Sequence, residues 1–167
     1  MATETEIKLS LSARTASALA KQAMLSNIER RRQLLINTYY DTHDKRLRRE
    51  RMVVRHRQKG RQWLLTVKTA PMLTAGLAQR SEWEVHSRPG EFDFSHLDGS
   101  VRELLESLRE SLQPAFSTHF MRHTWLLEPR AGVRIELALD RGWIEARGQR
   151  QTIREIELEL LDGTVSD

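Results

Sequence analysis

The chain has 167 residues, of which 39% are hydrophobic and 30% are charged, and its net charge is +4. This length and this balance predict a globular protein of one domain and argue against a disordered chain. The sequence has no cysteine, no apolar leader and no stretch of membrane-spanning length, so we expect no disulfide, no thiolate metal site, no export and no membrane insertion, and we expect a cytoplasmic location.

In chain order, the sequence predicts strands with short connections and helices at two places. The first helix is expected at 12–32, where alanine and other good helix formers are frequent. The second is expected to begin at a capping box of Ser100 and Glu103, to carry apolar residues at helical spacing, and to end before Pro114. The predicted strands are 3–11, 34–41, 50–59, 62–69, 78–87, 117–127, 131–139, 142–146 and 152–161.

The connections between the predicted strands are short. Turns are expected at Lys59-Gly60, at 128–132 and at 140–142, where glycine, proline and aspartate gather. Consecutive strands joined by short turns pair in the antiparallel sense. We therefore predict a mainly antiparallel β protein with flanking helices, in the α+β class.

Charged and apolar residues alternate along most predicted strands, so each strand has a charged face and an apolar face. Glu155, Glu157 and Glu159 share one such face, and glutamates gather on the terminal strands while arginine and lysine gather on the middle ones. A sandwich with solvated charges is one reading. A barrel with a charged lumen and helices over its apolar outer face is the other, and the segregation of charge favours it, because an ordinary solvent face interleaves opposite charges.

Residues 45–61 contain nine basic residues and one acid, Glu50. Such a stretch indicates an anionic partner, and a solvated basic surface is the alternative. RNA is the least favoured partner, because the stretch has no Phe, Tyr or Trp on which bases could stack.

Several short motifs occur in an order that resembles the CYTH, or triphosphate tunnel metalloenzyme, superfamily, and most closely its bacterial inorganic triphosphatase branch. The stretches LINTYYDT and FSTHFMRHTW add to the likeness with that branch. The resemblance implies a closed, tunnel-like barrel of about eight antiparallel strands with a charged lumen open at both ends. The motifs are Glu4-x-Glu6-x-Lys8, Tyr39-Tyr40-Asp41-Thr42, Arg55-x-Arg57, Thr66-Val67-Lys68, Arg80 with Glu82 and Glu84, Arg122, LALDRG with Asp140, and Glu155-x-Glu157-x-Glu159.

The resemblance also implies roles for the charged residues. Arginine and lysine are suited to phosphate, and carboxylate oxygens are suited to Mg²⁺ or Mn²⁺. The substrate-binding set is Lys8, Arg55, Arg57, Lys68, Arg80, Arg122 and Arg134, and its catalytic members are Lys8, Arg55, Arg57 and Lys68. The metal-ligand candidates are Glu4, Glu6, Asp140, Glu155, Glu157 and Glu159. Tyr39 and Tyr40 share one predicted strand. Core packing is the expected role of each, although one of them can face inward. The histidines are expected to be structural or surface residues.

The implied function is metal-dependent hydrolysis of inorganic triphosphate to diphosphate and phosphate. Other CYTH activities (thiamine triphosphatase or class IV-type adenylate cyclase) and a non-catalytic polyphosphate-binding module remain alternatives. The expected partner is a small-molecule triphosphate, with no nucleic acid and no membrane, and the oligomeric state is not predicted. Relatives usually continue into a further helix and often into a helical CHAD domain. Here the expected unit is one tunnel domain over 1–167, without that helix and without a following domain. The inward faces are expected to carry seven basic and nine acidic residues.

Overall fold

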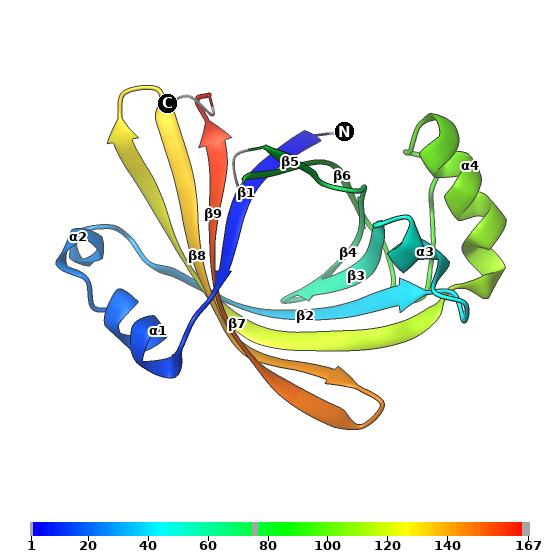
Figure 1. Ribbon diagram of the computed structural model, residues 1–167, viewed down its shortest axis with the longest axis horizontal. Helices are drawn as coiled ribbons and strands as arrows, with labels where there is room; N and C mark the ends of the chain where they lie inside the picture. Colours follow the sequence, from blue (N-terminus) through cyan, green and yellow to red (C-terminus); the bar gives the residue numbers. More distant parts are fainter. Residues whose placement is uncertain (1, 75–76, 165–167) are drawn as a thin grey trace.

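The computed structural model describes residues 2–74 and 77–164, in which eight antiparallel strands close into a barrel (Figure 1). The strand order is β1-β9-β8-β7-β2-β3-β4-β6, the pairing of β1 with β6 closes the ring, and β5 pairs with β6 alone. The predicted antiparallel barrel is therefore confirmed. The strands are β1 (Ala2–Ser10), β2 (Arg31–Asp41), β3 (Val53–Lys59), β4 (Gln62–Lys68), β5 (Met72–Thr74), β6 (Leu77–His86), β7 (Gln113–Arg130), β8 (Val133–Ala146) and β9 (Gln149–Asp162).

Helices cover the apolar outer face of the barrel on opposite sides (Figure 1). On one side, Leu65 and Val67 of β4 are buried in a cluster with Leu105 of α4. On the other, Trp125 of β7 and Ile156 of β9 pack in a cluster with residues of α1 and α2. Aliphatic side chains thus lie outside the barrel wall and beneath helices, which excludes the sandwich. The helices are α1 (Ala13–Leu19), α2 (Ala23–Ser26), α3 (Arg46–Arg49), α4 (Gly99–Leu108) and the 3₁₀ turn η1 (Arg109–Ser111).

The prediction of one helix over 12–32 is wrong, because α1 and α2 occupy its first part and β2 begins at Arg31. Arg31 and Arg32 are good helix formers, yet they pair with Thr124 and His123 of β7. Pairing with a long neighbouring strand outweighs a local helix preference of a few tenths of a kcal/mol, about the spread among such residues.

The predicted turn at 140–142 is also wrong, because β8 runs unbroken through it. Gly142 is needed there for a different reason: a Cβ on it would lie 1.9 Å from the backbone oxygen of His119 on β7. The hairpin turn lies further on, at Arg147 and Gly148, whose φ angles are 51° and 74°, as in a type I′ turn.

The second helix differs from the prediction at its N-terminus. Its N-cap is Asp98, with no capping side-chain bond, so Ser100 and Glu103 do not form the predicted capping box. At the other end, α4 and η1 finish at Leu108 and Ser111, before Pro114 as predicted, and Pro114 itself lies inside β7. The short helix α3 in the basic stretch was not predicted at all. None of the helices in the described parts of the chain is long and apolar enough to cross a membrane.

Candidate active site

The barrel encloses a cavity of about 1090 Å³. Every barrel strand contributes at least one charged side chain to its wall. Of the predicted site residues, the structure brings twelve together on this wall: Lys8, Arg55, Arg57, Lys68, Arg80, Arg122, Glu4, Glu6, Asp140, Glu155, Glu157 and Glu159.

Arg134 is the predicted site residue that does not line the cavity. Its guanidinium Nε donates to Asp162 Oδ2 at 2.6 Å, and about half of its side chain is exposed. The β8–β9 pairing shifts register between Arg134 and Ile135. Such an irregularity breaks the strict alternation of side chains between the two faces. Arg134 therefore does not share the inward face of Glu136, although the two residues are two apart on β8.

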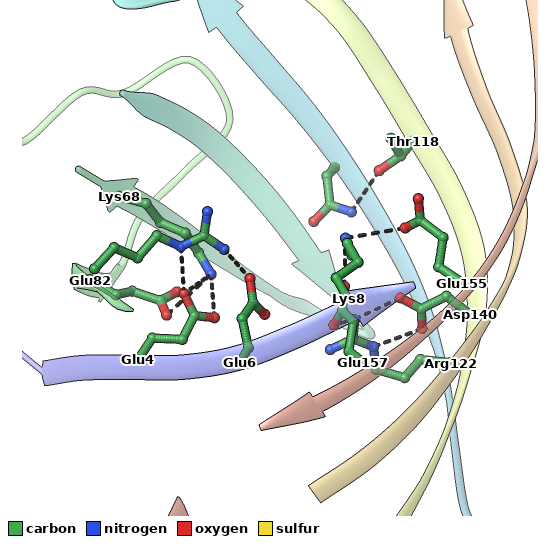
Figure 2. A network of polar contacts seen from close by, with 12 residues as sticks. Glu4, Glu6, Lys8, Lys68, Glu82, Thr118, Arg122, Asp140, Glu155 and Glu157 are labelled. Atoms are coloured by element: carbon green, nitrogen blue, oxygen red, sulfur yellow. Dashed lines mark hydrogen bonds and ion pairs between the residues drawn. The ribbon is translucent and has the colours of Figure 1, made fainter. Parts of the chain in front are cut away.

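A first polar cluster joins β1, β4 and β6 around Glu4 (Figure 2). Lys68 Nζ donates to Glu4 Oε1 at 2.6 Å and lies 3.3 Å from Glu82 Oε2. Arg80 donates from Nε to Glu4 at 2.8 Å and from Nη2 to Glu6 at 2.6 Å. Burial raises the pKa of Glu4, but Lys68 and Arg80 outweigh it and the pKa of Glu4 is lowered. Glu4 is therefore held ionised between two cations.

A second polar cluster joins β1, β7, β8 and β9 around Glu157 (Figure 2). Lys8 Nζ lies 2.6 Å from Glu157 Oε1 and 3.1 Å from Glu155 Oε2. Arg122 donates to both oxygens of Asp140, at 2.8 and 2.6 Å, and also to Glu157. Burial opposes ionisation of Glu157, but Arg122 and Lys8 prevail and hold its pKa at about 2.

Arg55 and Arg57 of β3 differ from these paired cations. Arg55 comes no nearer than 3.8 Å to Glu82, its one ion-pair partner among the described residues, and its buried Nε has no hydrogen-bond partner there. Arg57 donates from Nε to Asn37 Oδ1 at 2.8 Å and makes no ion pair with any described residue. Burial, followed by repulsion from Arg55 and Arg122, lowers the pKa of Arg57 to about 10. This part of the wall carries positive charge that an anion would neutralise.

The opposite imbalance occurs at Glu159 of β9. It faces Glu6 of β1 and Glu136 of β8 in direct register. Burial, and then the negative charges of Glu4 and Glu82, raise the pKa of Glu159 to about 7. A row of hard oxygen donors that repel one another fits a divalent cation. Among the residues the structure describes, no three His, Asp or Glu side chains are already gathered into a metal-binding group.

The structure shows that Tyr39 is the tyrosine that faces inward, and it adds Asn37, which the sequence did not single out, to the same face. Tyr39 lines the cavity and stacks on Phe116, with ring centroids 4.4 Å apart, so core packing is wrong for Tyr39 and holds for Tyr40, which packs against the outer cluster. Tyr39 is opposite Arg55 in the β2–β3 register, so the two side chains share a face. Knowledge of this strand pairing would have predicted that Tyr39 faces inward. Asn37, which donates to Thr118, belongs to the same face.

The charge balance of the wall also differs from expectation. Over 2–74 and 77–164, ten basic and nine acidic side chains line the cavity, where seven and nine were expected. Arg134 is absent from the set. The added cations are Arg31, Arg32, Lys59 and Arg154, all of them exposed. None of the histidines is a lining residue within the described chain.

The fold and this wall define a tunnel that holds cations and carboxylates in contact. The chain belongs to the CYTH domain family, whose model matches residues 2–166. It is 37% identical to the inorganic triphosphatase of Haemophilus influenzae over 171 residues, covering 100% of this chain and 47% of that protein. The chain thus spans about half the length of that relative.

Solved structures show the same fold at lower identity. An adenylyl cyclase candidate from Hippeastrum, described with a dominant triphosphatase activity, superposes with a TM-score of 0.61 at 21% identity, over 93% of this chain and 79% of that one. An adenylate cyclase candidate from Bacillus halodurans superposes with a TM-score of 0.57 at 22% identity, over 98% of this chain and 83% of that one.

Proposed function

We propose that this protein hydrolyses inorganic triphosphate to diphosphate and phosphate with the help of a divalent metal ion, Mg²⁺ or Mn²⁺. The observation that carries the proposal is the weakly compensated charge of Arg55 and Arg57. The cations Lys8, Lys68, Arg80 and Arg122 of the same wall are instead paired closely with carboxylates. Two neighbouring guanidinium groups with little carboxylate compensation suit the several negative charges of a triphosphate. The likeness to the Haemophilus inorganic triphosphatase supports the same substrate.

The acidic part of the wall supports the metal requirement. CYTH triphosphatases are metal-dependent, and the ligand candidates for a divalent ion in this chain are Glu4, Glu6, Asp140, Glu155, Glu157 and Glu159. Glu159 is the most favoured of them, because burial and then the negative charges of Glu4 and Glu82 raise its pKa, and a cation would offset those charges. When bound, the metal supplies neutralisation of the charge that develops on phosphate oxygens.

In the proposed mechanism, Arg55 and Arg57 bind and orient the phosphate chain. Lys68, Arg80 and Arg122 turn from their carboxylate partners toward phosphate oxygens, which frees Glu4 and Glu157 for the metal. Lys8 stays protonated, because Glu157 and Glu155 raise its pKa despite burial. It therefore stabilises the negative charge of the leaving phosphate and does not act as a base. Arg134 has no part in this scheme.

The test is phosphate release from inorganic triphosphate, ATP, thiamine triphosphate and long-chain polyphosphate, each with Mg²⁺ and with Mn²⁺. We expect inorganic triphosphate to be hydrolysed fastest, with no turnover in EDTA. Cyclic AMP formation from ATP at a comparable rate would assign the cyclase activity instead. Tight polyphosphate binding without any turnover would assign the non-catalytic module. A small-molecule substrate and a cytoplasmic location remain part of the proposal.

A further inference from the structure

A second cavity, of about 910 Å³, adjoins the tunnel. It is lined by the end of β2, by α3, by the starts of β3 and β7, and by the β8–β9 turn. Its wall shares Tyr39, Val53 and Phe116 with the tunnel, so the stacked rings of Tyr39 and Phe116 stand at the boundary. The predicted substrate and metal residues do not line it.

The cations of this second cavity lack carboxylate partners. Lys45, Arg48, Arg51 and Arg147 line it, and none of them makes an ion pair within the described chain. Their chain neighbours behave differently, since Arg46 and Arg49 are paired with acids at 2.9 and 2.6 Å. Three unpaired cations of the first part of the basic stretch, together with Arg147 of the β8–β9 turn, therefore line the cavity.

The acidic side chain that lines this cavity is already occupied. Asp41 accepts hydrogen bonds from the backbone nitrogens of Thr42 and Leu47, at 2.8 and 2.9 Å, and of Arg48 at 3.3 Å. Asp41 thus caps the start of α3 and does not reach the cavity cations. An entering anion would meet little competition from this carboxylate.

The backbone at this cavity is unusual as well. Lys45, Arg51 and Arg147 have φ angles of 59°, 53° and 51°, and they are the non-glycine residues of the described chain in the left-handed region. All three line the second cavity. Arg147 holds the first central position of the β8–β9 turn, where asparagine is the favoured residue. Sparsely populated backbone conformations that gather at one cavity are typical of ligand-binding sites.

We propose that the second cavity is a binding site for condensed inorganic phosphate that needs no metal ion. Four unpaired cations match a ligand with about one negative charge per phosphate. The ligand is either the far end of a chain whose reacting end lies in the tunnel or a separate short anion. The chain-bridging form rests on the proposed triphosphatase function; the site itself does not.

The test variant removes three of these charges without disturbing the backbone. Asparagine adopts the left-handed conformation readily, so the triple variant Lys45→Asn, Arg51→Asn, Arg147→Asn is expected to fold. The matched control is Arg14→Gln, Lys21→Gln, Arg102→Gln, which removes the same charge from exposed residues that line neither cavity. Binding of tripolyphosphate and of long-chain polyphosphate is measured by calorimetry in EDTA, and tripolyphosphate turnover is measured separately with metal.

The triple asparagine variant is expected to bind polyphosphate roughly tenfold or more weakly than the wild type, while the control changes by less than about twofold. A loss confined to long-chain polyphosphate identifies a bridging chain. Loss of one of two tripolyphosphate sites identifies a separate anion. Metal-dependent turnover of tripolyphosphate stays the same in either case. Wild-type binding by the triple asparagine variant, or an equal loss in the control, would overturn the proposal even if the tunnel proves to be a triphosphatase.

Discussion

Glu157 and Glu159 lie two residues apart on the same face of β9, yet the pKa values of their carboxyl groups move in opposite directions. Burial raises both pKa values, but Arg122 and Lys8 contact Glu157 and lower its pKa, whereas the negative charges of Glu4 and Glu82 raise the pKa of Glu159 further. One pKa is held at about 2 and the other rises to about 7. The repeated glutamates of this strand are therefore not equivalent.

Glu159→Gln is expected to stabilise the metal-free protein at high pH only. The folded pKa of about 7 lies above the ordinary 4.5, so the folded state binds this proton more tightly than the unfolded chain. The contribution of protonated Glu159 to the free energy of unfolding is therefore fully present below pH 4.5 and is lost as the pH rises through 7. Thermal unfolding in EDTA should show a gain of about 2 kcal/mol at pH 8 and none at pH 4. An equal gain at both pH values would contradict the assigned cause.

Divalent metal binding is expected to strengthen between pH 6 and pH 8. A metal ion bound at Glu159 must displace its proton, so affinity follows the fraction of Glu159 that is ionised. Titration of Mg²⁺ by calorimetry in buffers of different ionisation enthalpy reports the proton released on binding. Glu159→Gln is the control, in which both the pH dependence and the proton release should be lost. Proton release that persists in this variant would place the metal elsewhere.

Glu157→Gln is expected to have the reverse effect on stability and to abolish turnover. Its folded pKa of about 2 lies below 4.5, so its contribution is present above pH 4.5 and is lost as the pH falls through 2. Removing this charge leaves Lys8 and Arg122 with fewer partners and should cost about 2 kcal/mol at pH 7. Urea unfolding in EDTA measures this cost. Wild-type turnover at low Mg²⁺ would show that Glu157 is not needed for metal binding.

Arg57→Ala is expected to weaken triphosphate binding by about thirtyfold, the equivalent of about 2 kcal/mol for a lost charge-assisted contact. Metal affinity should be retained, because Arg57 makes no ion pair with the described carboxylates. The matched control is Arg134→Ala, which removes the same kind of side chain from outside the cavity. Equilibrium binding in Ca²⁺, compared with kinetics in Mg²⁺, separates binding from turnover. A similar loss in both variants would point to net charge alone.

The alternation of residue types predicted which residues share a face, while the segregation of charge and the family resemblance favoured the barrel over the sandwich and pointed to most of its wall. Period-two alternation places Glu4, Glu6 and Lys8 on one face whatever the neighbouring strands are, and the same holds for Arg55 and Arg57. The prediction that Arg134 faces inward was wrong, because the sequence of one strand does not reveal the register shift next to it. The predicted turn at 140–142 was wrong for a related reason. In a sequence, a glycine such as Gly142 that permits close approach to another strand looks the same as a turn glycine.

The partners of the charged residues could not be predicted. Alternation places Glu157 and Glu159 on one face, but the difference between their pKa values depends on which charged residues of the other strands come near each of them. That register is set by the closure of the whole barrel. The second cavity was beyond the sequence for the same reason, since Lys45 and Arg147 meet only through the fold.

The pairing of β1 with β9 joins segments from opposite ends of the described chain. Closing a loop over such a sequence distance is slow, because the chain loses conformational entropy before the contacts between the two strands contribute favourable free energy. Lys8 cannot reach Glu157 until this seam forms, and Glu4 cannot meet Arg80 until β1 also joins β6. The cluster around Glu157 therefore assembles late in folding, and a nascent chain that has not yet released β9 from the ribosome lacks it.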